Sequence, residues 1–352
     1  MNKKFFGALA LVAALGLPAS ANASLQTLSS LFVFGDSLSD GGNSGLVSQA
    51  AQGYTFPPPP YYNGRYSNGP VAVEYLWKSY NPGDTSFKPS LDCLTTCGTN
   101  YAIGGATTGL ASYNSVNPNV PPPLQPAYNN LGNNWQLNTF AAQAPVFDPV
   151  SSLFVIWLFP NDLFYYQKTG MTPGTAGGAA GIGPVGIDQL IGNGIKNIVD
   201  TVLFLESKGA QHFLVANMPD LAKTPDGYGN PALTALTQAF DFDLAQALTL
   251  LDVALTSAEI VQFDTYRFFN DAIADPSRFG FTNTTERCVD NILNGRCNPY
   301  NNTWLFWDGS HPTTYAHSVL GGEFRASVPE PETILLVAIG LLGIFVTRRR
   351  AV

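Results

Sequence analysis

Four short apolar runs along the chain predict buried β-strands. They are rich in β-branched and aromatic residues and span 31–34, 153–159, 212–216 and 259–263. Runs of this length and composition are typical of strands that are covered on both faces. The first run ends immediately before a cluster of small and acidic residues, where a strand would give way to a turn.

Two longer stretches, 187–203 and 232–255, repeat apolar residues every three or four positions, which predicts amphipathic helices. Gly209 follows the first stretch as a helix stop. Because strands alternate with helices, we expect an α/β domain whose parallel sheet is covered by helices on both faces. Neither a repeat nor a shift in composition divides the region 24–327, so one domain is expected there.

The connections between these elements are long and rich in Pro and Gly. They include 57–60, 117–126 and 172–184. Long loops in a compact domain are often functional covers. The stretch 172–184 comes soon after a candidate site residue, Asn161, and we expect it to form a flexible cover over the site.

The first 23 residues have the pattern of a signal peptide. Lys3 and Lys4 precede an apolar run over 5–17, and small residues occupy positions 21 and 23. A signal peptidase reads small residues in this arrangement, whereas a buried N-terminal helix would not require them. We expect export and a mature chain that begins near Ser24.

The last 25 residues, 328–352, contain Pro-Glu-Pro at 329–331, an apolar segment over 334–346 and three arginines at 348–350. Basic residues after an apolar segment favour a membrane anchor whose positive end stays in the cytoplasm. The segment is short, so a buried helix is the physical alternative. The order of these features resembles the PEP-CTERM sorting signal of Gram-negative bacteria. The resemblance implies an exosortase-type processing enzyme as a partner and location in the cell envelope or outside the cell.

Charge excludes some classes of partner. Outside the two ends, the chain keeps 12 of its 17 Lys and Arg residues and 23 of its 25 Asp and Glu residues, a net charge of −11. An acidic domain without a basic run is unsuited to nucleic acid or to anionic lipid surfaces. We therefore expect no nucleic-acid partner.

Four cysteines form two close pairs in the sequence, Cys93 with Cys97 and Cys288 with Cys297. In an exported protein, such pairs favour local disulfides. A zinc site is the alternative, but no His lies near either pair and the spacings fit no zinc ribbon or finger. We expect two disulfides and no metal.

A candidate for nucleophilic catalysis arises from one serine and one histidine. His311 follows Asp308 by three residues, and such a loop can supply a base together with the carboxylate that orients it. Ser37 follows the first predicted strand, at the sheet edge where α/β folds place their sites. Taken singly, each motif is equally typical of a surface turn. No Gly-x-Ser-x-Gly elbow is present, which disfavours the ordinary α/β-hydrolase arrangement.

Four blocks of sequence occur in the order found in one hydrolase family. They are FGDSLSD at 34–40, NYAIGGA at 100–106, FPND at 159–162 and DGSHP at 308–312, and GRYSNGP at 64–70 fits the lipase and esterase branch. The chain resembles the GDSL, or SGNH, hydrolases. The resemblance implies a three-layer αβα sandwich with a parallel, flavodoxin-like sheet.

The same resemblance implies roles for individual residues. Ser37 would be the nucleophile, His311 the base and Asp308 the acid of a catalytic triad, with no cofactor. The oxyanion would be bound by the amides of Ser37 and Gly105, with Gly104 as the alternative, and by the side chain of Asn161. The family usually carries Gly where this chain has Pro160, which puts the path of that loop in question. His317 and His212 are interpreted as structural.

These observations favour an exported serine hydrolase that cleaves carboxylic esters of the lipase or esterase type. An acyltransferase or a polysaccharide O-acetyl esterase would use the same acyl-enzyme. A non-catalytic surface or matrix module on the same fold is a further alternative.

Overall fold

Six parallel strands form one sheet in the order β2-β3-β1-β4-β5-β6 in the computed structural model, which describes residues 25, 27–92 and 98–328. The strands are β1 (Ser30–Gly35), β2 (Lys88–Pro89), β3 (Gly98–Asn100), β4 (Ser152–Trp157), β5 (His212–Ala216) and β6 (Glu259–Phe263). The four strands of five or six residues, β1, β4, β5 and β6, are the four predicted ones, because each contains a largely apolar run. β2 and β3 were not expected.

The side chains of each central strand alternate between two cores, one on each face of the sheet. On β1, Phe32 and Phe34 belong to one core, whereas Leu31 and Val33 belong to the other. The first core is closed by α3 (Asn133–Gln143), α5 (Ile187–Glu206) and α6 (Pro231–Ala254). The second is closed by α2 (Ala72–Tyr80), α7 (Thr265–Ala274) and α8 (Thr314–Ser327).

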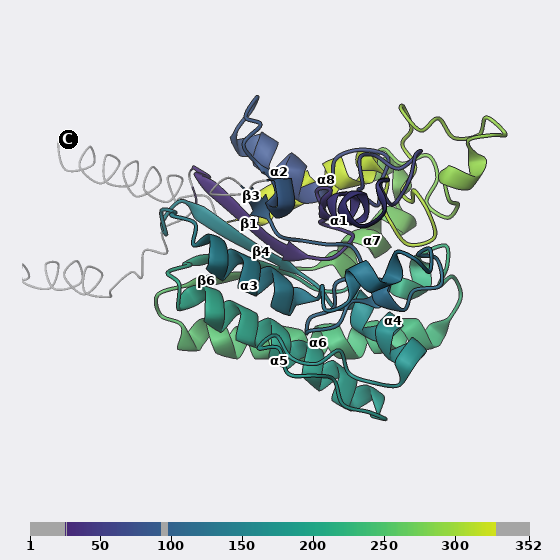
Figure 1. Ribbon diagram of the computed structural model, residues 1–352. Coiled ribbons are helices and arrows are strands. Elements are labelled where there is room, and N and C mark those ends of the chain that lie inside the picture. Colours follow the sequence, from purple (N-terminus) through teal and green to yellow (C-terminus); the bar gives the residue numbers. More distant parts are fainter. Residues whose placement is uncertain (1–24, 26, 93–97, 329–352) are drawn as a thin grey trace, which may run out of the picture. The chain divides into compact units, whose positions relative to one another are not determined.

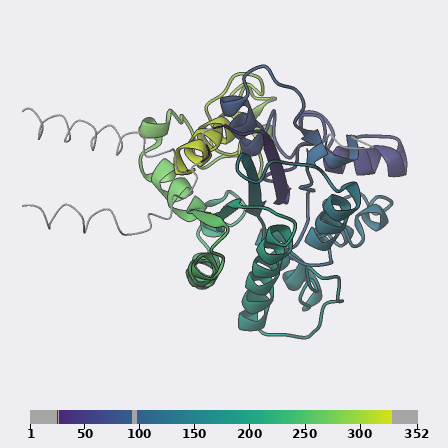
Figure 2. The ribbon, with the colours of Figure 1, turned by 90° about the vertical axis from the view of Figure 1, so that its left-hand side faces the viewer.

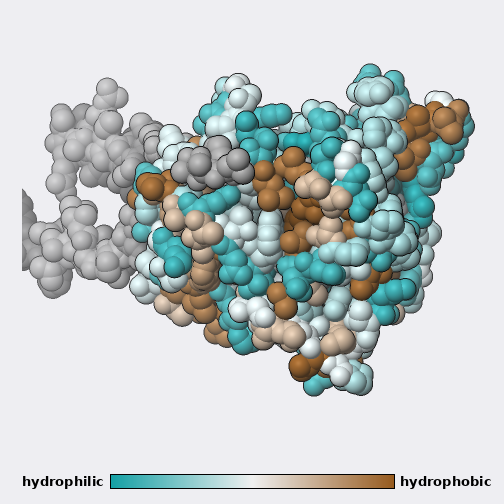
Figure 3. Space-filling model, in the orientation of Figure 1, coloured by the Kyte–Doolittle hydropathy of each residue, from teal (hydrophilic) through white to brown (hydrophobic). Residues whose placement is uncertain are grey.

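The helices therefore form two layers around the sheet, as Figure 1 shows for α2 and α8 on one side and α3, α5 and α6 on the other. Figure 2, turned by 90°, shows the yellow α8 and the teal α5 on opposite sides of the strands. The expected three-layer αβα sandwich is confirmed. On the face in Figure 3, hydrophobic residues lie in small groups among polar ones, as on most folded proteins.

Both predicted helices are present. The stretch 187–203 lies within α5, and Gly209 follows the helix with a φ of 101°, a conformation that favours glycine. The stretch 232–255 corresponds to α6, whose first turn is capped by the Asn230 side chain accepting the Ala232 amide.

One predicted boundary was wrong. The apolar run 153–159 was expected to be a strand throughout, but β4 ends at Trp157 and α4 (Pro160–Thr169) begins three residues later. Phe159 turns the chain with a φ of 123°, which is strained for a residue with a side chain. Its buried ring stacks on Phe240 of α6 with the centroids 3.7 Å apart, and this packing stabilises the turn.

The strand order changes direction at β1, in the middle of the sheet. From β1 the chain passes to β2 and β3 on one side of β1, then returns to β4 on the other side. At such a switch point the loops at the carboxyl ends of the strands diverge and leave a crevice. The order β3-β1-β4-β5-β6 is the flavodoxin-like order, and β2 extends it at the edge.

Some expectations fall on residues outside the described ranges. These are the signal peptide at 1–23, most of the tail 328–352 and the pair Cys93–Cys97. Cys288 and Cys297 are joined in a disulfide, with their Cα atoms 5.4 Å apart, as expected. In the part of the chain that the structure describes, no helix is both long and apolar enough for a membrane span.

Candidate active site

Ser37, His311 and Asp308 form a continuous chain of hydrogen bonds. Ser37 Oγ lies 2.8 Å from His311 Nε2, and His311 Nδ1 lies 2.8 Å from Asp308 Oδ2 and 2.9 Å from Oδ1. Ser37 is largely buried, two residues after the end of β1. The structure thus brings together the three residues that the sequence proposed as nucleophile, base and acid.

The loop that carries Asp308 and His311 is folded around the aspartate. Asp308 Oδ1 accepts the amides of Ser310 at 3.0 Å and His311 at 2.8 Å. The Trp307 amide donates to the His311 carbonyl at 2.7 Å, which closes the turn. A short Asp-initiated turn therefore holds the carboxylate beside the imidazole.

The stretch 64–70 fixes this loop from the other side. The Ser67 hydroxyl donates to the Pro312 carbonyl at 2.9 Å, and Asn68 Oδ1 accepts the Thr314 amide at 2.8 Å. The Tyr66 ring lies against the His311 ring, with centroids 5.1 Å apart. These contacts give the GRYSNGP block a physical role, which is to support the loop with the histidine.

Burial and ion pairing shift the pKa values of Asp308 and His311 in opposite directions. Burial alone would raise the pKa of Asp308, but the charge of His311 and the hydrogen bonds from His311 and Ser310 outweigh it and lower that pKa. Burial would lower the pKa of His311, and the Asp308 carboxylate raises it above its ordinary value. The arrangement therefore stabilises an imidazolium beside a carboxylate, the state that forms when His311 takes a proton.

Ser37, Gly105 and Asn161 line the same cavity, and each has a hydrogen-bond donor that is not fully used. The amides of Ser37 and Gly105 donate to no other group among the described residues. The Gly104 amide, by contrast, donates to Asp40 Oδ2 and Ser44 Oγ, each at 2.9 Å. Between the two glycines, only Gly105 thus keeps an amide available for an oxyanion. Its φ of 80° is in the left-handed region that favours glycine.

Pro160 occupies a helix position that suits proline. It is the first residue of α4, a position where a helix leaves its amides unpaired and where proline is common. Asn161 follows in the first turn, and its Nδ2 donates to Asp36 Oδ2 at 3.1 Å. The second hydrogen of Nδ2 stays available. Replacing the family's glycine by proline therefore keeps Asn161 at the site.

Two buried carboxyl groups hold the turns on which these donors lie. Asp36 Oδ1 accepts the Leu38 amide at 2.9 Å, and burial raises the pKa of Asp36 to about 6. Asp162 accepts the amide and hydroxyl of Thr108, and burial raises its pKa to about 7. The Asp162 contact ties the start of α4 to the loop after Gly105.

The site opens into a cavity of about 700 Å³. Its walls are largely aromatic, apolar and amide side chains from the segments that follow β1, β3, β4, β5 and β6. The charged residues among them are Asp36, Asp226, Arg287, Asp290, Asp308 and His311. Arg287 is the one Lys or Arg among the lining residues, and it is paired with Asp226 and Asp290. The cavity therefore offers polar and apolar surface but no free cation.

The prediction that the stretch 172–184 covers the site was wrong. No residue of 172–184 lines the cavity. The Gly-rich loop instead packs on α5 and α3, because Asn197 accepts the Ala176 amide and donates to the Gly174 carbonyl, and Asn134 donates to the Ala176 carbonyl. The segment 56–61, called the Pro-rich loop below, supplies Phe56, Pro57 and Pro58 to the cavity wall.

The remaining histidines lie outside the hydrogen-bond chain. His317, buried on α8, accepts the Ala72 amide at Nδ1, and burial lowers its pKa to about 3. His212 opens β5, with Nδ1 3.5 Å from Glu259. Among the described residues, no group of three or more His, Cys, Asp or Glu is arranged to hold a metal ion.

Comparison with known families matches residues 31–324 to the GDSL-like Lipase/Acylhydrolase family. The chain belongs to this family. Residues 327–350 match the PEP-CTERM protein-sorting motif, which indicates export and sorting through the C-terminus. Both resemblances drawn from the sequence are thereby confirmed, and with them the fold class.

Relatives of this GDSL protein include enzymes of two kinds. It is 28% identical to a phosphatidylcholine-sterol acyltransferase of Aeromonas hydrophila, over 82% of this chain and 72% of the relative. It is 26% identical to a GDSL esterase/lipase of Arabidopsis thaliana, over 89% of each chain. Among solved structures, an acetylxylan esterase from Geobacillus stearothermophilus matches with a TM-score of 0.40 and 14% identity, over 87% of this chain and 97% of that one.

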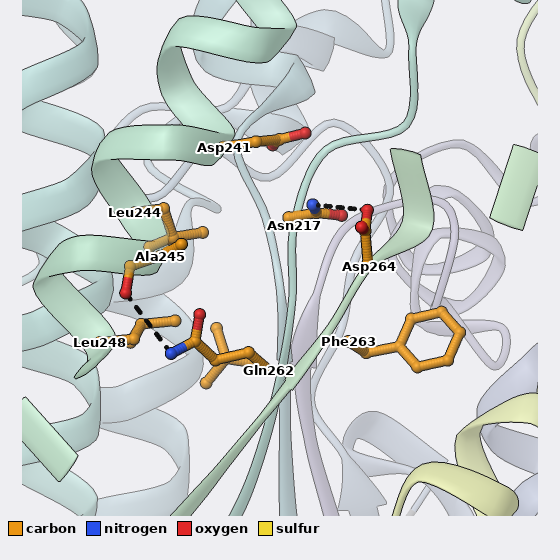
Figure 4. A pocket seen from close by; sticks show the side chains of 9 residues that line it. Asn217, Asp241, Leu244, Ala245, Leu248, Gln262, Phe263 and Asp264 are labelled. Atoms are coloured by element: carbon orange, nitrogen blue, oxygen red, sulfur yellow. Dashed lines mark hydrogen bonds between the residues drawn. The ribbon is translucent and has the colours of Figure 1, made fainter. Parts of the chain in front are cut away.

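A second cavity of about 140 Å³ lies between α6 and the carboxyl ends of β5 and β6, and shares no lining residue with the first. Figure 4 shows Asp241 directed from α6 toward the side formed by Asn217 and Asp264. Asp241 Oδ1 accepts the Met218 amide at 2.9 Å, while Oδ2 is buried without a partner among the described residues. Burial raises the pKa of Asp241 to about 8.

The Asp241→Asn variant is expected to gain stability over the wild type as the pH rises from 5 to 8. The folded pKa is about 8 and the ordinary value is 3.8, so between them the unfolded chain releases a proton that the folded chain keeps. The stability that the wild type owes to this protonated carboxyl is therefore fully present below about pH 4. It is lost progressively as the pH rises toward 8. An amide cannot ionise and still accepts the Met218 amide.

Thermal or urea unfolding at pH 5 and pH 8 measures this difference. We expect a gain of about 1–3 kcal/mol at pH 8, the cost of a buried unpaired polar group. Asp243→Asn, at an exposed position of the same helix, is the matched control and should change stability little at either pH. An equal effect of Asp241→Asn at both values would contradict the assignment.

Proposed function

We propose that this GDSL protein is an exported serine hydrolase that cleaves carboxylic esters through an acyl-enzyme on Ser37. The observation that carries the proposal is the chain from Ser37 Oγ to His311 and Asp308, with each link at 2.8 Å. A serine hydroxyl is a weak nucleophile until a base takes its proton, and this chain supplies the base and its orienting carboxylate.

In the proposed mechanism, Ser37 Oγ attacks the ester carbonyl while His311 Nε2 takes its proton. Asp308 holds His311 in the orientation that presents Nε2 and stabilises its positive charge. His311 then returns the proton to the leaving alcohol, and the acyl group stays on Ser37. Water, activated by the same histidine, releases the acid in the second half of the reaction.

The oxyanion of the tetrahedral intermediate would be bound by the Ser37 and Gly105 amides and the Asn161 side chain. The Ser37 and Gly105 amides donate to no group among the described residues, and Asn161 Nδ2 keeps one of its two hydrogens available. This supports the assignment, because donors in place before the reaction need no reorganisation. One such donor contributes roughly 3–4 kcal/mol to transition-state stabilisation.

The Ser37→Ala variant is expected to lose hydrolysis of p-nitrophenyl esters of graded acyl length, with kcat lowered at least about a thousandfold. Only the attacking oxygen is removed, so the fold should persist. Ser86→Ala, exposed and outside the cavity, is the control and should keep full activity. The proposal fails if Ser37→Ala is as active as the wild type, or if both are inactive on every ester.

An acyltransferase that passes the acyl group to an alcohol is the second candidate. The phosphatidylcholine-sterol acyltransferase among its relatives favours this possibility. Turnover in the presence of an added alcohol separates the two, since an acyltransferase yields a new ester in preference to the free acid. The sorting motif motivates a further version, an O-acetyl esterase of extracellular polysaccharide. The paired Ser37, His311 and Asp308 support either enzyme over a non-catalytic surface module.

We further propose that residues 1–23 are a signal peptide, that 24–327 form the hydrolase domain and that 328–352 anchor and sort it. The match of 327–350 to the sorting motif supports the last part. The partners would be a signal peptidase and an exosortase-type enzyme, and the location the envelope or exterior of a Gram-negative cell.

Removal of residues 329–352 should leave ester hydrolysis unchanged and move the activity from the cell envelope to the medium. The cut spares Val328, which is buried against the core. Activity in fractions of expressing cells measures the change, and alanines at 329–331 form a second variant that keeps the apolar segment. Unchanged retention of the truncated protein would contradict the sorting assignment.

A further inference from the structure

A tyrosine on the Pro-rich loop contacts the acid of the triad. The Tyr61 hydroxyl donates to Asp308 Oδ2 at 2.8 Å, across 247 positions of sequence. Its ring meets Trp307, the residue before Asp308, edge to face with centroids 5.7 Å apart and planes at 90°. The Tyr61 amide also donates to the Pro58 carbonyl at 3.1 Å, so the prolines fix the turn from which the ring projects.

This contact differs from every other hydrogen bond that Asp308 accepts. Within the described residues, the other donors are the Ser310 and His311 amides and the His311 ring, all from the same short loop. Tyr61 is thus the one donor that ties the carboxylate to a separate segment. It shares Oδ2 with the proton of His311 Nδ1, so it acts on the oxygen that orients the base.

The phenol stays a donor across the working pH range. Burial, followed by the negative charge of Asp308, raises the pKa of Tyr61 far above its ordinary value. A neutral hydroxyl at this position stabilises the charged carboxylate and offsets part of its attraction for the imidazolium. The geometry therefore allows the hydroxyl both to hold the carboxylate and to limit the basicity of His311.

We propose that Tyr61 is a positioning residue of the hydrolase, which fixes Asp308 Oδ2 and thereby sets the orientation and the basicity of His311. This inference rests on the proposed function, because it concerns the same acid and base. It also assigns a role to the Pro-rich loop, whose prolines present one hydroxyl to the triad in addition to lining the cavity.

The Tyr61→Phe variant tests the inference, because it removes one oxygen and keeps the ring on Trp307. Without the hydroxyl, Asp308 attracts the proton of His311 more strongly, so the acidic limb of the kcat/KM profile should move up by about half a pH unit. On the plateau, kcat should fall by up to about tenfold, as expected for one lost hydrogen bond to a charged group.

Tyr62→Phe is the matched control. Tyr62 is the adjacent residue, 43% exposed, lies under the Arg65 guanidinium and does not line the cavity. Its hydroxyl has no hydrogen-bond partner among the described residues, so its removal should leave both the pH profile and kcat at wild-type values. Thermal unfolding of both variants shows whether the fold is retained.

Titration of the histidine ring protons by NMR measures the same shift directly. The chain has three histidines, and His317, with a pKa of about 3, stays neutral above pH 5. A higher pKa of His311 in Tyr61→Phe than in Tyr62→Phe is the expected result. A fall in activity without a shift of the acidic limb or of this pKa would reduce Tyr61 to a structural contact and overturn the inference.

Failure of this inference is distinguishable from failure of the proposed function. If Ser37→Ala is inactive while Tyr61→Phe has the wild-type profile, the hydrolase stands and the role of Tyr61 falls. If Ser37→Ala keeps full activity, the triad itself is refuted.

Discussion

The hydrogen bond between Ser37 Oγ and His311 Nε2 joins residues 274 positions apart, and the fold is what makes it possible. Ser37 is fixed because β1 is central in the sheet and its apolar residues are buried on both faces. His311 lies on a loop with little regular structure of its own. That loop is held by its own aspartate, by Ser67 and Asn68 on the adjoining segment, and by α8, which continues from it into the second core.

The site keeps several carboxylates buried with hardly any positive charge nearby. Asp36, Asp40 and Asp162 are each buried and accept amides or hydroxyls from their own turns or from the turn opposite. These bonds compensate for lost hydration and fix the turns that carry the donors around Ser37. Arg65 is committed elsewhere, in a two-point contact with Glu74 of α2. The imidazole is therefore the cation most closely coupled to Asp308, as the proposed reaction requires.

The four longer strands and the two long helices could be predicted because each has a local signature in the sequence. Ser37, His311 and Asp308 have no such signature taken singly, and they were proposed from the order of four sequence blocks that resemble one family. Strands of two or three residues such as β2 and β3 carry no period, so they were missed. The path at Phe159 depends on a ring stack with a helix 81 residues later in the chain. Tyr61 was missed for the same reason, since nothing beside it in the sequence indicates an aspartate 247 positions away. The Gly-rich composition of 172–184 led to the wrong prediction of a cover over the site. Composition does not reveal that Asn197 of α5 holds this loop.

The central claim is that Ser37 is an activated nucleophile, and covalent labelling tests it most directly. A fluorophosphonate reagent is attacked by an activated serine and leaves a stable adduct. Intact-mass measurement should show one adduct per chain, and peptide mapping should place it on Ser37. Ser37→Ala should stay unlabelled, and His311→Ala should react far more slowly because the base is missing. An unlabelled wild-type protein, or an adduct on another residue that persists in Ser37→Ala, would contradict the account.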